Sequence, residues 1–157
     1  MANVMRWRYG DTNPVVLPVA ALTVIDIGDL IYQSSGAALP ASELSDVGTE
    51  AGNQEAFHDV FVGVAMQASP SGVSNPIRVA TSGVFEFDCV STTAEVGDLF
   101  GADEDGTGVE LMSQVVAKVA TANLAVGRCA KRINPAATRA LVEIVSTVLR
   151  GGPQVMA

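Results

Sequence analysis

Two segments of this 157-residue sequence carry side chains that could do chemistry: a lone histidine and an acidic hexapeptide. His58 stands beside Asp59 in a polar stretch. Nothing in the sequence resembles a serine nucleophile elbow or a cysteine-protease signature, so this histidine has no evident nucleophile to activate. We therefore expect His58 to be a structural residue.

The acidic hexapeptide, residues 103–108, places carboxylates at alternate positions ahead of a glycine, as a calcium loop does. Such a loop needs a bidentate acid eleven residues after its first ligand, and Gln114 occupies that position. The Asp-Gly pair and the second glycine are typical of a hairpin tip. We expect an acidic turn joining a strand at Leu99 to one at Val109, and no metal site.

The two cysteines, Cys89 and Cys129, are far apart and show no CxxC spacing or Cys/His cluster. We expect two buried free thiols, and the alternative is a disulfide between them. The sequence contains neither a GxxxxGK[ST] phosphate loop nor a GxGxxG fingerprint after a strand. We therefore predict no catalytic residue and no cofactor, and we expect that the chain is not an enzyme.

The formal net charge of −8 argues against a function in which the chain grips nucleic acid. Sixteen of the seventeen acidic residues precede Leu111, whereas six of the nine basic residues follow Glu110. The two halves can pair within one domain, or they can contact neighbouring copies or a partner lattice. The longest apolar stretch, residues 15–25, contains Pro18 and is too short for a membrane helix, so we expect no membrane partner.

The composition and periodicity predict an all-β fold. Hydrophobic residues make up 48% of the chain but aromatic residues only 5%, and short β-branched runs alternate with Gly, Asp, Asn and Pro. The clearest strand pattern is at residues 85–89, where Phe85, Phe87 and Cys89 would face a core. A second alternating strand is expected within residues 139–149, with Ala140, Val142, Ile144 and Val148 on one side.

A weak internal repeat divides the chain into two similar units. Three motifs recur in the same order, with offsets of 69, 64 and 61 residues: 27–32 with 96–101, 62–66 with 126–130, and 77–80 with 138–142. Each unit then consists of a Gly-Asp turn, a strand, a variable loop, a strand whose glycine permits a close backbone approach, and a closing strand. Two such units would bury their apolar faces on each other in a compact β-barrel or sandwich.

The predicted organisation is an N-terminal arm (1–14), a single β domain (15–149) with the repeat at about 24–90 and 92–149, and a C-terminal tail (150–157). The first unit contains a long insertion, residues 34–59, which we expect to be mainly a surface loop. Residues 53–60 can form one or two helical turns before the chain enters a strand at Phe61.

The N-terminal arm carries the candidate binding residues Arg6, Trp7, Arg8 and Tyr9, whose types are enriched in interface hot spots. If the arm extends from the body, it can add a strand to the sheet edge of a partner, with Trp7 as an anchor. In that case deletion of residues 1–12 would leave a folded protein that no longer binds. The alternative is that Trp7 caps the barrel.

The repeat units resemble a family of small capsid decoration (cement) proteins of tailed bacteriophages. The resemblance rests on the order and spacing of short motifs: residues 92–100, 126–130 and 139–144 in the second unit, and Gly28-Asp29, residues 63–65 and residues 83–85 in the first. It covers most of residues 24–149, and the insertion at 34–59 and the Trp-containing arm depart from it.

The resemblance implies a small β-barrel on the outer surface of the virion capsid. Such a protein binds the major capsid protein, commonly as a homotrimer at local threefold positions, and stabilises the shell by bridging capsid subunits. An acidic chain suits an outer surface better than one that touches packaged DNA. Two alternatives remain at this point: another virion structural role, in head completion or in the tail, and a small-ligand-binding β-barrel or an enzyme with its site at the barrel mouth.

Overall fold

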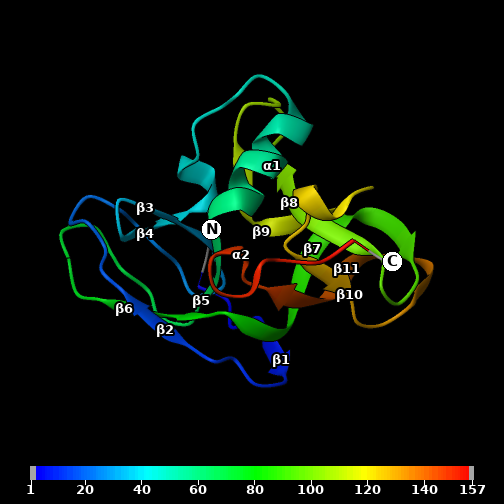
Figure 1. Ribbon diagram of the computed structural model, residues 1–157, viewed down its shortest axis with the longest axis horizontal. Helices are drawn as coiled ribbons and strands as arrows, with labels where there is room; N and C mark the ends of the chain where they lie inside the picture. Colours follow the sequence, from blue (N-terminus) through cyan, green and yellow to red (C-terminus); the bar gives the residue numbers. More distant parts are fainter. Residues whose placement is uncertain (1–2, 156–157) are drawn as a thin grey trace.

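The computed structural model describes residues 3–155 and consists mainly of β-strands (Figure 1). The first part of the chain forms β1 (Trp7–Tyr9), β2 (Val15–Leu17), β3 (Leu30–Ser34), β4 (Ala37–Pro40), the 3-10 helix η1 (Ala41–Glu43), α1 (Glu50–Val60), β5 (Phe61–Ala65) and β6 (Ile77–Ala80). The second part forms β7 (Ser82–Ala94), β8 (Leu99–Glu104), β9 (Leu111–Lys118), the 3-10 helix η2 (Ala122–Leu124), β10 (Gly127–Cys129), β11 (Ile133–Val145) and α2 (Thr147–Arg150). The predicted all-β class is confirmed.

The strands form a closed barrel and a second sheet beside it. In the barrel the order is β7-β11-β10-β8-β9, and a parallel pairing of β7 with β9, Asp88 opposite Val115, closes the ring. β1 adds to the edge of β7. The second sheet has the order β2-β6-β5-β3-β4, and the Ala38 N–H donates to the Pro18 carbonyl at 2.9 Å, which links its outer strands.

The two sheets share one strand order, because β2 to β6 occupy the places that β7 to β11 occupy in the barrel. The Gly-Asp turns at the start of the sequence repeat have matching geometry. The Asp26 N–H donates to the Asp29 carboxylate at 2.9 Å, and the Glu95 N–H donates to the Asp98 carboxylate at the same distance. Both turns place their glycine at positive φ, +99° in the first and +95° in the second, which a side chain would strain.

The middle strands of each unit contain a glycine that packs directly on a neighbouring backbone. A Cβ added to Gly63 would lie 1.6 Å from the Ala80 carbonyl oxygen, and one added to Gly127 would lie 2.2 Å from the Glu143 carbonyl oxygen. Only a glycine fits such an approach. The close backbone contact predicted from the sequence is therefore present in both units, in β5 and in β10.

The structure corrects the alignment of the closing strands. Met66 N–H donates to the Arg78 carbonyl and Ala130 N–H donates to the Leu141 carbonyl, so Arg78 corresponds to Leu141 and the offset is 63 residues, not 61. The arginine that both closing strands contain suggested the wrong register. The strand order also places β7 at the start of the second unit, so the units are separated near Thr81 and not between residues 90 and 92.

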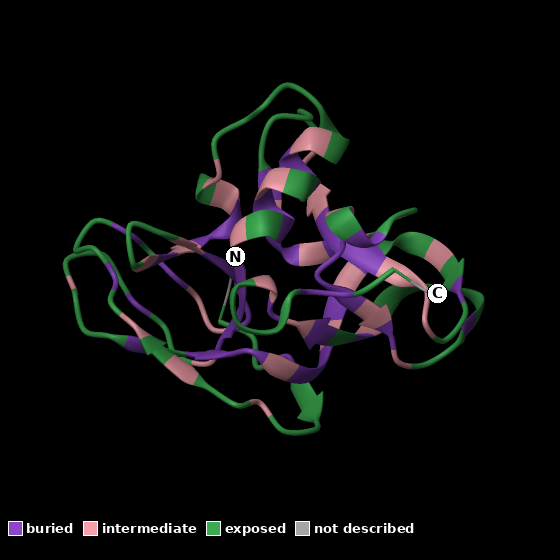
Figure 2. Ribbon diagram, viewed as in Figure 1, coloured by how far each residue is buried: buried purple, intermediate pink, exposed green. Residues whose placement is uncertain are grey.

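The buried apolar residues form two clusters: a larger one that joins the barrel interior to residues of the first unit such as Leu30, Phe61 and Val64, and a smaller one inside the first unit. Figure 2 shows buried residues in both units. The predicted alternation in β7 is confirmed, since Phe85, Phe87 and Cys89 are buried. In β11, Ala140, Val142 and Ile144 are buried as expected, but the strand ends at Val145 and Val148 is exposed in α2. The smaller cluster inside the first unit consists of Val19, Ile25, Ile31, Ala38, Val62, Ala65, Ile77 and Val79.

The insertion, residues 34–59, is more ordered than the sequence indicated, because it contains β4, η1 and most of α1. α1 begins at Glu50, where the Thr49 side chain caps it by accepting from the Gly52 N–H at 3.0 Å. Phe57 is fully buried, and its ring centroid lies 5.5 Å from that of Phe61. The helical turns expected at residues 53–60 are confirmed, as part of a helix that begins earlier, at Glu50. The expectation that the insertion is mainly a surface loop is wrong, because this helix covers the junction of the two units, as Figure 1 shows. The strand predicted at Phe61 is confirmed.

The C-terminal residues pack on the body as far as they are described. α2 ends at Arg150, the following Gly151 adopts a left-handed conformation, and Gly152 and Pro153 are buried. Gly152 lies against His58, so a Cβ there would come within 2.7 Å of the imidazole. Residues 1–2 and 156–157, which belong to the predicted arm and tail, lie outside the described part of the chain.

Candidate functional site

The N-terminal segment lies on the barrel. β1 pairs antiparallel with β7, with Trp7 opposite Phe85, and the Glu86 N–H donates to the Arg6 carbonyl at 2.8 Å. The interpretation in which the arm extends from the body is therefore wrong, because the edge of β7 offers backbone groups that β1 satisfies. Two further backbone hydrogen bonds fix the segment, donated by Val4 to Ile27 and by Thr81 to Thr12.

Arg6 is only 7% exposed, and its guanidinium is enclosed by hydrogen-bond acceptors. Its Nε and Nη2 donate to Gln114 Oε1 at 3.0 and 2.9 Å, and Nη1 donates to the Glu86 carbonyl at 3.2 Å. The Asp88 carboxylate lies 3.3 Å from Nη2, and the Phe87 ring centroid lies 6.0 Å from the guanidinium carbon. Arg6 thus acts inside the molecule, and its side chain is not accessible to a partner.

Gln114 connects this arginine to the first unit. Its Nε2 donates at 2.9 Å to Asp29, a buried carboxylate in the turn before β3. Burial raises the pKa of Asp29, while hydrogen bonds from the Asp26 N–H and from Gln114 act in the opposite direction. The chain of Arg6, Gln114 and Asp29 therefore joins the N-terminal segment, the barrel and the first sheet.

The other three predicted binding residues are exposed. Trp7 is 40% exposed and donates from Nε1 to the Gly10 carbonyl at 3.0 Å, so it neither hangs free nor fills the barrel. Tyr9 is 52% exposed, and Met5 beside them is 48% exposed. We call Met5, Trp7 and Tyr9 the aromatic edge. Among the described strands β1 pairs only with β7, so Trp7 and Tyr9 lie on an ordered strand whose outer side is open, and Met5 lies just before it.

Arg8 lies where the arm meets a groove on β7 and β11. Its guanidinium is 3.2 Å from Glu86, whose carboxylate also lies 3.3 Å from Arg139. A cavity of about 310 Å³ opens here, and we call it the basic groove. It is lined by Glu86, Lys131, Arg132, Ile133, Asn134, Pro135, Ala137, Arg139 and Leu141.

The salt bridges show how far the acidic and basic parts of the sequence pair within one chain, which was one of the two interpretations of the uneven charge. Lys118 pairs with Asp98 at 2.8 Å, and Arg132 pairs with Glu95 at 3.0 Å, so basic residues of the later part do meet acids of the earlier part within one chain. Lys131 makes no ion pair with any residue in 3–155. Intramolecular pairing is thus present but incomplete around the basic groove.

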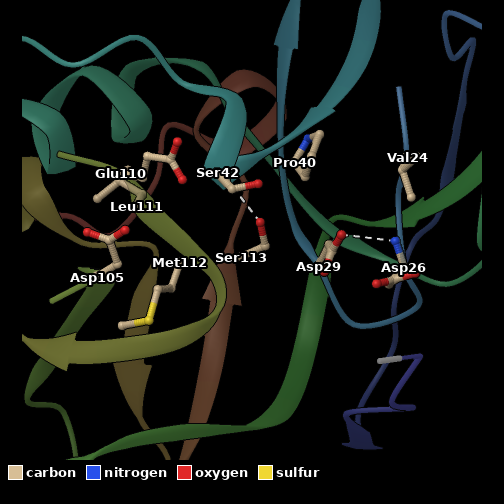
Figure 3. A pocket seen from close by; sticks show the side chains of 10 residues that line it. All are labelled: Val24, Asp26, Asp29, Pro40, Ser42, Asp105, Glu110, Leu111, Met112 and Ser113. Atoms are coloured by element: carbon tan, nitrogen blue, oxygen red, sulfur yellow. Dashed lines mark hydrogen bonds between the residues drawn. The ribbon is translucent and has the colours of Figure 1, made fainter. Parts of the chain in front are cut away.

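A second cavity, of about 280 Å³, lies between the first sheet and the β8–β9 hairpin (Figure 3). Asp26 and Asp29 line one side, and Asp105 and Glu110 come from the hairpin. Asp29 has both carboxylate oxygens occupied by donors, and the Ser113 hydroxyl accepts from the Ser42 N–H at 3.1 Å. Asp29 and Ser113 thus serve local structure.

Residues singled out for chemistry have structural surroundings. His58 is buried, and its Nδ1 lies 2.7 Å from the Ala125 carbonyl. Cys89 and Cys129 are buried free thiols, as expected, and burial raises the pKa of both. Of the acidic hexapeptide, Asp103 and Glu104 end β8, and the turn at the tip between β8 and β9 consists of residues 105–110, where Asp105 accepts from the Thr107 N–H at 3.0 Å. Within residues 3–155 no cluster of three or more His, Cys, Asp or Glu side chains could hold a metal ion.

Comparison with family models, with curated proteins and with solved structures finds no match to this chain. Among the described residues, no helix is long and apolar enough to cross a membrane.

Sequence reasoning located the exposed aromatic residues but missed the basic groove and the role of Gln114. The excess of basic residues after Glu110 was a usable signal, since it includes Lys131, Arg132 and Arg139. That Arg8 would join them depends on the pairing of β1 with β7, across a separation of 78 residues from Glu86. Gln114 lies in β9 between Ser113 and two valines. From the sequence alone, a polar residue in that position can face either solvent or the interior.

Proposed function

We propose that this chain is a non-enzymatic structural protein of a tailed-phage virion, which binds the outer capsid surface and stabilises the shell by bridging major capsid protein subunits. The observation that carries the proposal is the aromatic edge, in which Trp7 and Tyr9 are exposed on the ordered outer strand β1 and Met5 is exposed just before it. Aromatic side chains held in place lose little entropy on binding, which suits them to anchor an interface.

The interior of the barrel favours a binding surface on the outside over a ligand site within. Phe87, Phe100, Leu111, Val116 and Val142 fill the core with almost no exposed area. A closed five-stranded barrel whose interior is filled with side chains binds its partners through its outer surface. The resemblance of the repeat units to capsid cement proteins then indicates the partner, and a homotrimer on the lattice would gain affinity through multivalency.

A protein that binds the assembled lattice but not the free subunit stabilises the shell by mass action. The acidic net charge of −8 is compatible with a position outside the capsid, away from packaged DNA. Copy number separates this role from head completion or a place in the tail. In gradient-purified virions, quantitative mass spectrometry should find about one copy per major capsid subunit, whereas a few copies per particle would indicate completion or tail.

The aromatic edge is tested directly by a Trp7→Ala, Tyr9→Ala double variant. We expect its affinity for shells that lack the protein to fall by at least about tenfold, because the anchor side chains are lost. A Val90→Ala variant, exposed on β7 away from the arm, is the matched control. Binding by the double variant at wild-type affinity, with wild-type circular dichroism, would contradict the proposed surface.

A further inference from the structure

Within the described part of the chain, the basic groove contains one basic side chain that no acid pairs with, whereas Arg132 and Arg139 form ion pairs with acids of their own chain. Lys131 forms no ion pair within residues 3–155, and Arg132 contacts Glu95 through Nε while its side chain stays 60% exposed. The groove walls include the apolar side chains of Ile133 and Leu141. A binding partner complementary to this groove would combine carboxylates, for the basic side chains, with a small apolar group for the apolar wall.

The β8–β9 tip has that combination. Glu110 and Val109 are exposed at its end, and Val109 is 47% exposed to solvent. Asp105 stiffens the turn, because its carboxylate accepts from the N–H and the hydroxyl of Thr107 at 3.0 and 2.6 Å. Its own N–H donates to the Glu110 carbonyl at 2.8 Å. The tip is thus an ordered acidic projection with an apolar side chain.

Within one chain these two features are far apart. The tip is attached to α1, since Asn53 Nδ2 donates to Glu104 Oε1 at 2.7 Å. The basic groove lies on β7 and β11, next to β1. Figure 1 shows the loop after β8 beside α1 and the segment before β11 at the opposite end of the barrel. The tip cannot therefore enter the groove of its own chain, but it can enter that of another.

We propose that the β8–β9 tip of one copy sits in the basic groove of a second copy, with Glu110 facing Lys131 and Arg132 and Val109 against the apolar wall. Two different surfaces meet in such a contact, so it is heterologous and closes into a ring when the rotation permits. The inference deepens the proposed function and rests on it for its biological role, since a ring would present several aromatic edges to the capsid. The contact itself is tested without any shell.

The experiment uses two charge-reversed full-length proteins. The groove variant is Lys131→Glu with Arg132→Glu, and the tip variant is Val109→Lys with Glu110→Lys, which leaves the Asp105 turn intact. Arg78→Glu on β6 and Glu55→Lys on α1 reverse exposed charges elsewhere and serve as controls. Sedimentation velocity and light scattering give the mass relative to the 16.2 kDa chain over a range of concentrations.

The wild type and both controls should associate as concentration rises, and the association should weaken between about 50 mM and about 500 mM salt. Each charge-reversed variant alone should associate at least about tenfold more weakly. An equimolar mixture of the two should regain association, because an acidic groove then meets a basic tip. Recovery in the mixture also shows that both variants are folded.

A wild type that stays monomeric at all concentrations, or a mixture that fails to recover while both variants keep the wild-type circular dichroism, would overturn the inference. Shell binding is measured separately with the Trp7→Ala, Tyr9→Ala variant. If the wild type binds shells as a monomer, the proposed function is retained and the contact between tip and groove is rejected. If it self-associates but does not bind shells, the contact is retained and the proposed function is rejected.

Discussion

Arg6 shows how one side chain can turn a terminal segment into part of the fold. Its guanidinium donates to Gln114 and to the Glu86 carbonyl, and it faces Asp88, so a positive charge is buried with its donors largely satisfied. Removing one partner of such a group costs more than the interaction itself is worth, because the remaining polar atoms stay buried without a partner. Deletion of residues 1–12 would also remove Arg6, together with β1, so we expect the truncated protein to be destabilised.

We predict that Arg6→Ala lowers the free energy of unfolding by about 3 kcal/mol, because Gln114 Oε1 loses both of its donors from this arginine. Urea denaturation followed by fluorescence of Trp7 measures the change. Arg8→Ala is the control, since this exposed arginine should contribute less than about 1 kcal/mol. Equal effects of the two substitutions would contradict the role of Arg6 as the buried link.

Each unit is organised around a middle strand that lies unusually close to its neighbour. Gly63 in β5 faces the Ala80 carbonyl, and Gly127 in β10 faces the Glu143 carbonyl. Because the clashing atoms belong to the backbone, a side chain at either glycine cannot be accommodated by a rotamer change. The sheet itself would have to separate.

We therefore predict that Gly63→Ala and Gly127→Ala each destabilise the protein by at least about 2 kcal/mol, as overpacking against a rigid neighbour does. Gly106→Ala is the matched control, because no atom lies within 4 Å of its Cβ position and its φ is not in the left-handed region. Its effect should stay within about 0.5 kcal/mol. Thermal unfolding of the three variants at one protein concentration compares them, and a tolerated Gly127→Ala would refute the close approach.

The elements that could be predicted from the sequence are those with local signals. The Gly-Asp turns and the alternation in β7 depend on neighbouring residues, and both are present in the structure. α1 was underestimated because most of its residues are polar and Phe57 alone among them is a large, fully buried apolar side chain. Arg6 and Gln114 are 108 residues apart, and no local sequence pattern predicts a contact between residues so far apart.

At the scale of the whole molecule, the barrel interior encloses both cysteines. Cys89 and Cys129 are buried, and burial raises the pKa of each thiol, which lowers the fraction of reactive thiolate at neutral pH. Both strands that carry them, β7 and β10, contribute to the closed barrel. Exposure of the thiols therefore requires the barrel to open.

We predict that a thiol reagent such as DTNB modifies neither cysteine rapidly in the native protein, and that both react fully on unfolding. The reaction rate in increasing urea should follow the opening free energy measured by denaturation. A Ser91→Cys variant, at an exposed position of β7, provides a fast-reacting reference. Rapid modification of Cys89 or Cys129 in the native state would mean that the barrel opens locally.

The two units share a strand order but differ at their outer edges, and this difference reduces the number of backbone donors that the first strand of each unit offers to another chain. The edge of β7 at Val84 is covered by β1, whereas the corresponding residue of the first unit is Pro14, which has no N–H to donate. With Pro18 at its other end, β2 offers an incoming strand only a short run of backbone donors. The first strand of each unit, β2 or β7, therefore has few backbone donors through which the matching unit of another copy could extend its sheet.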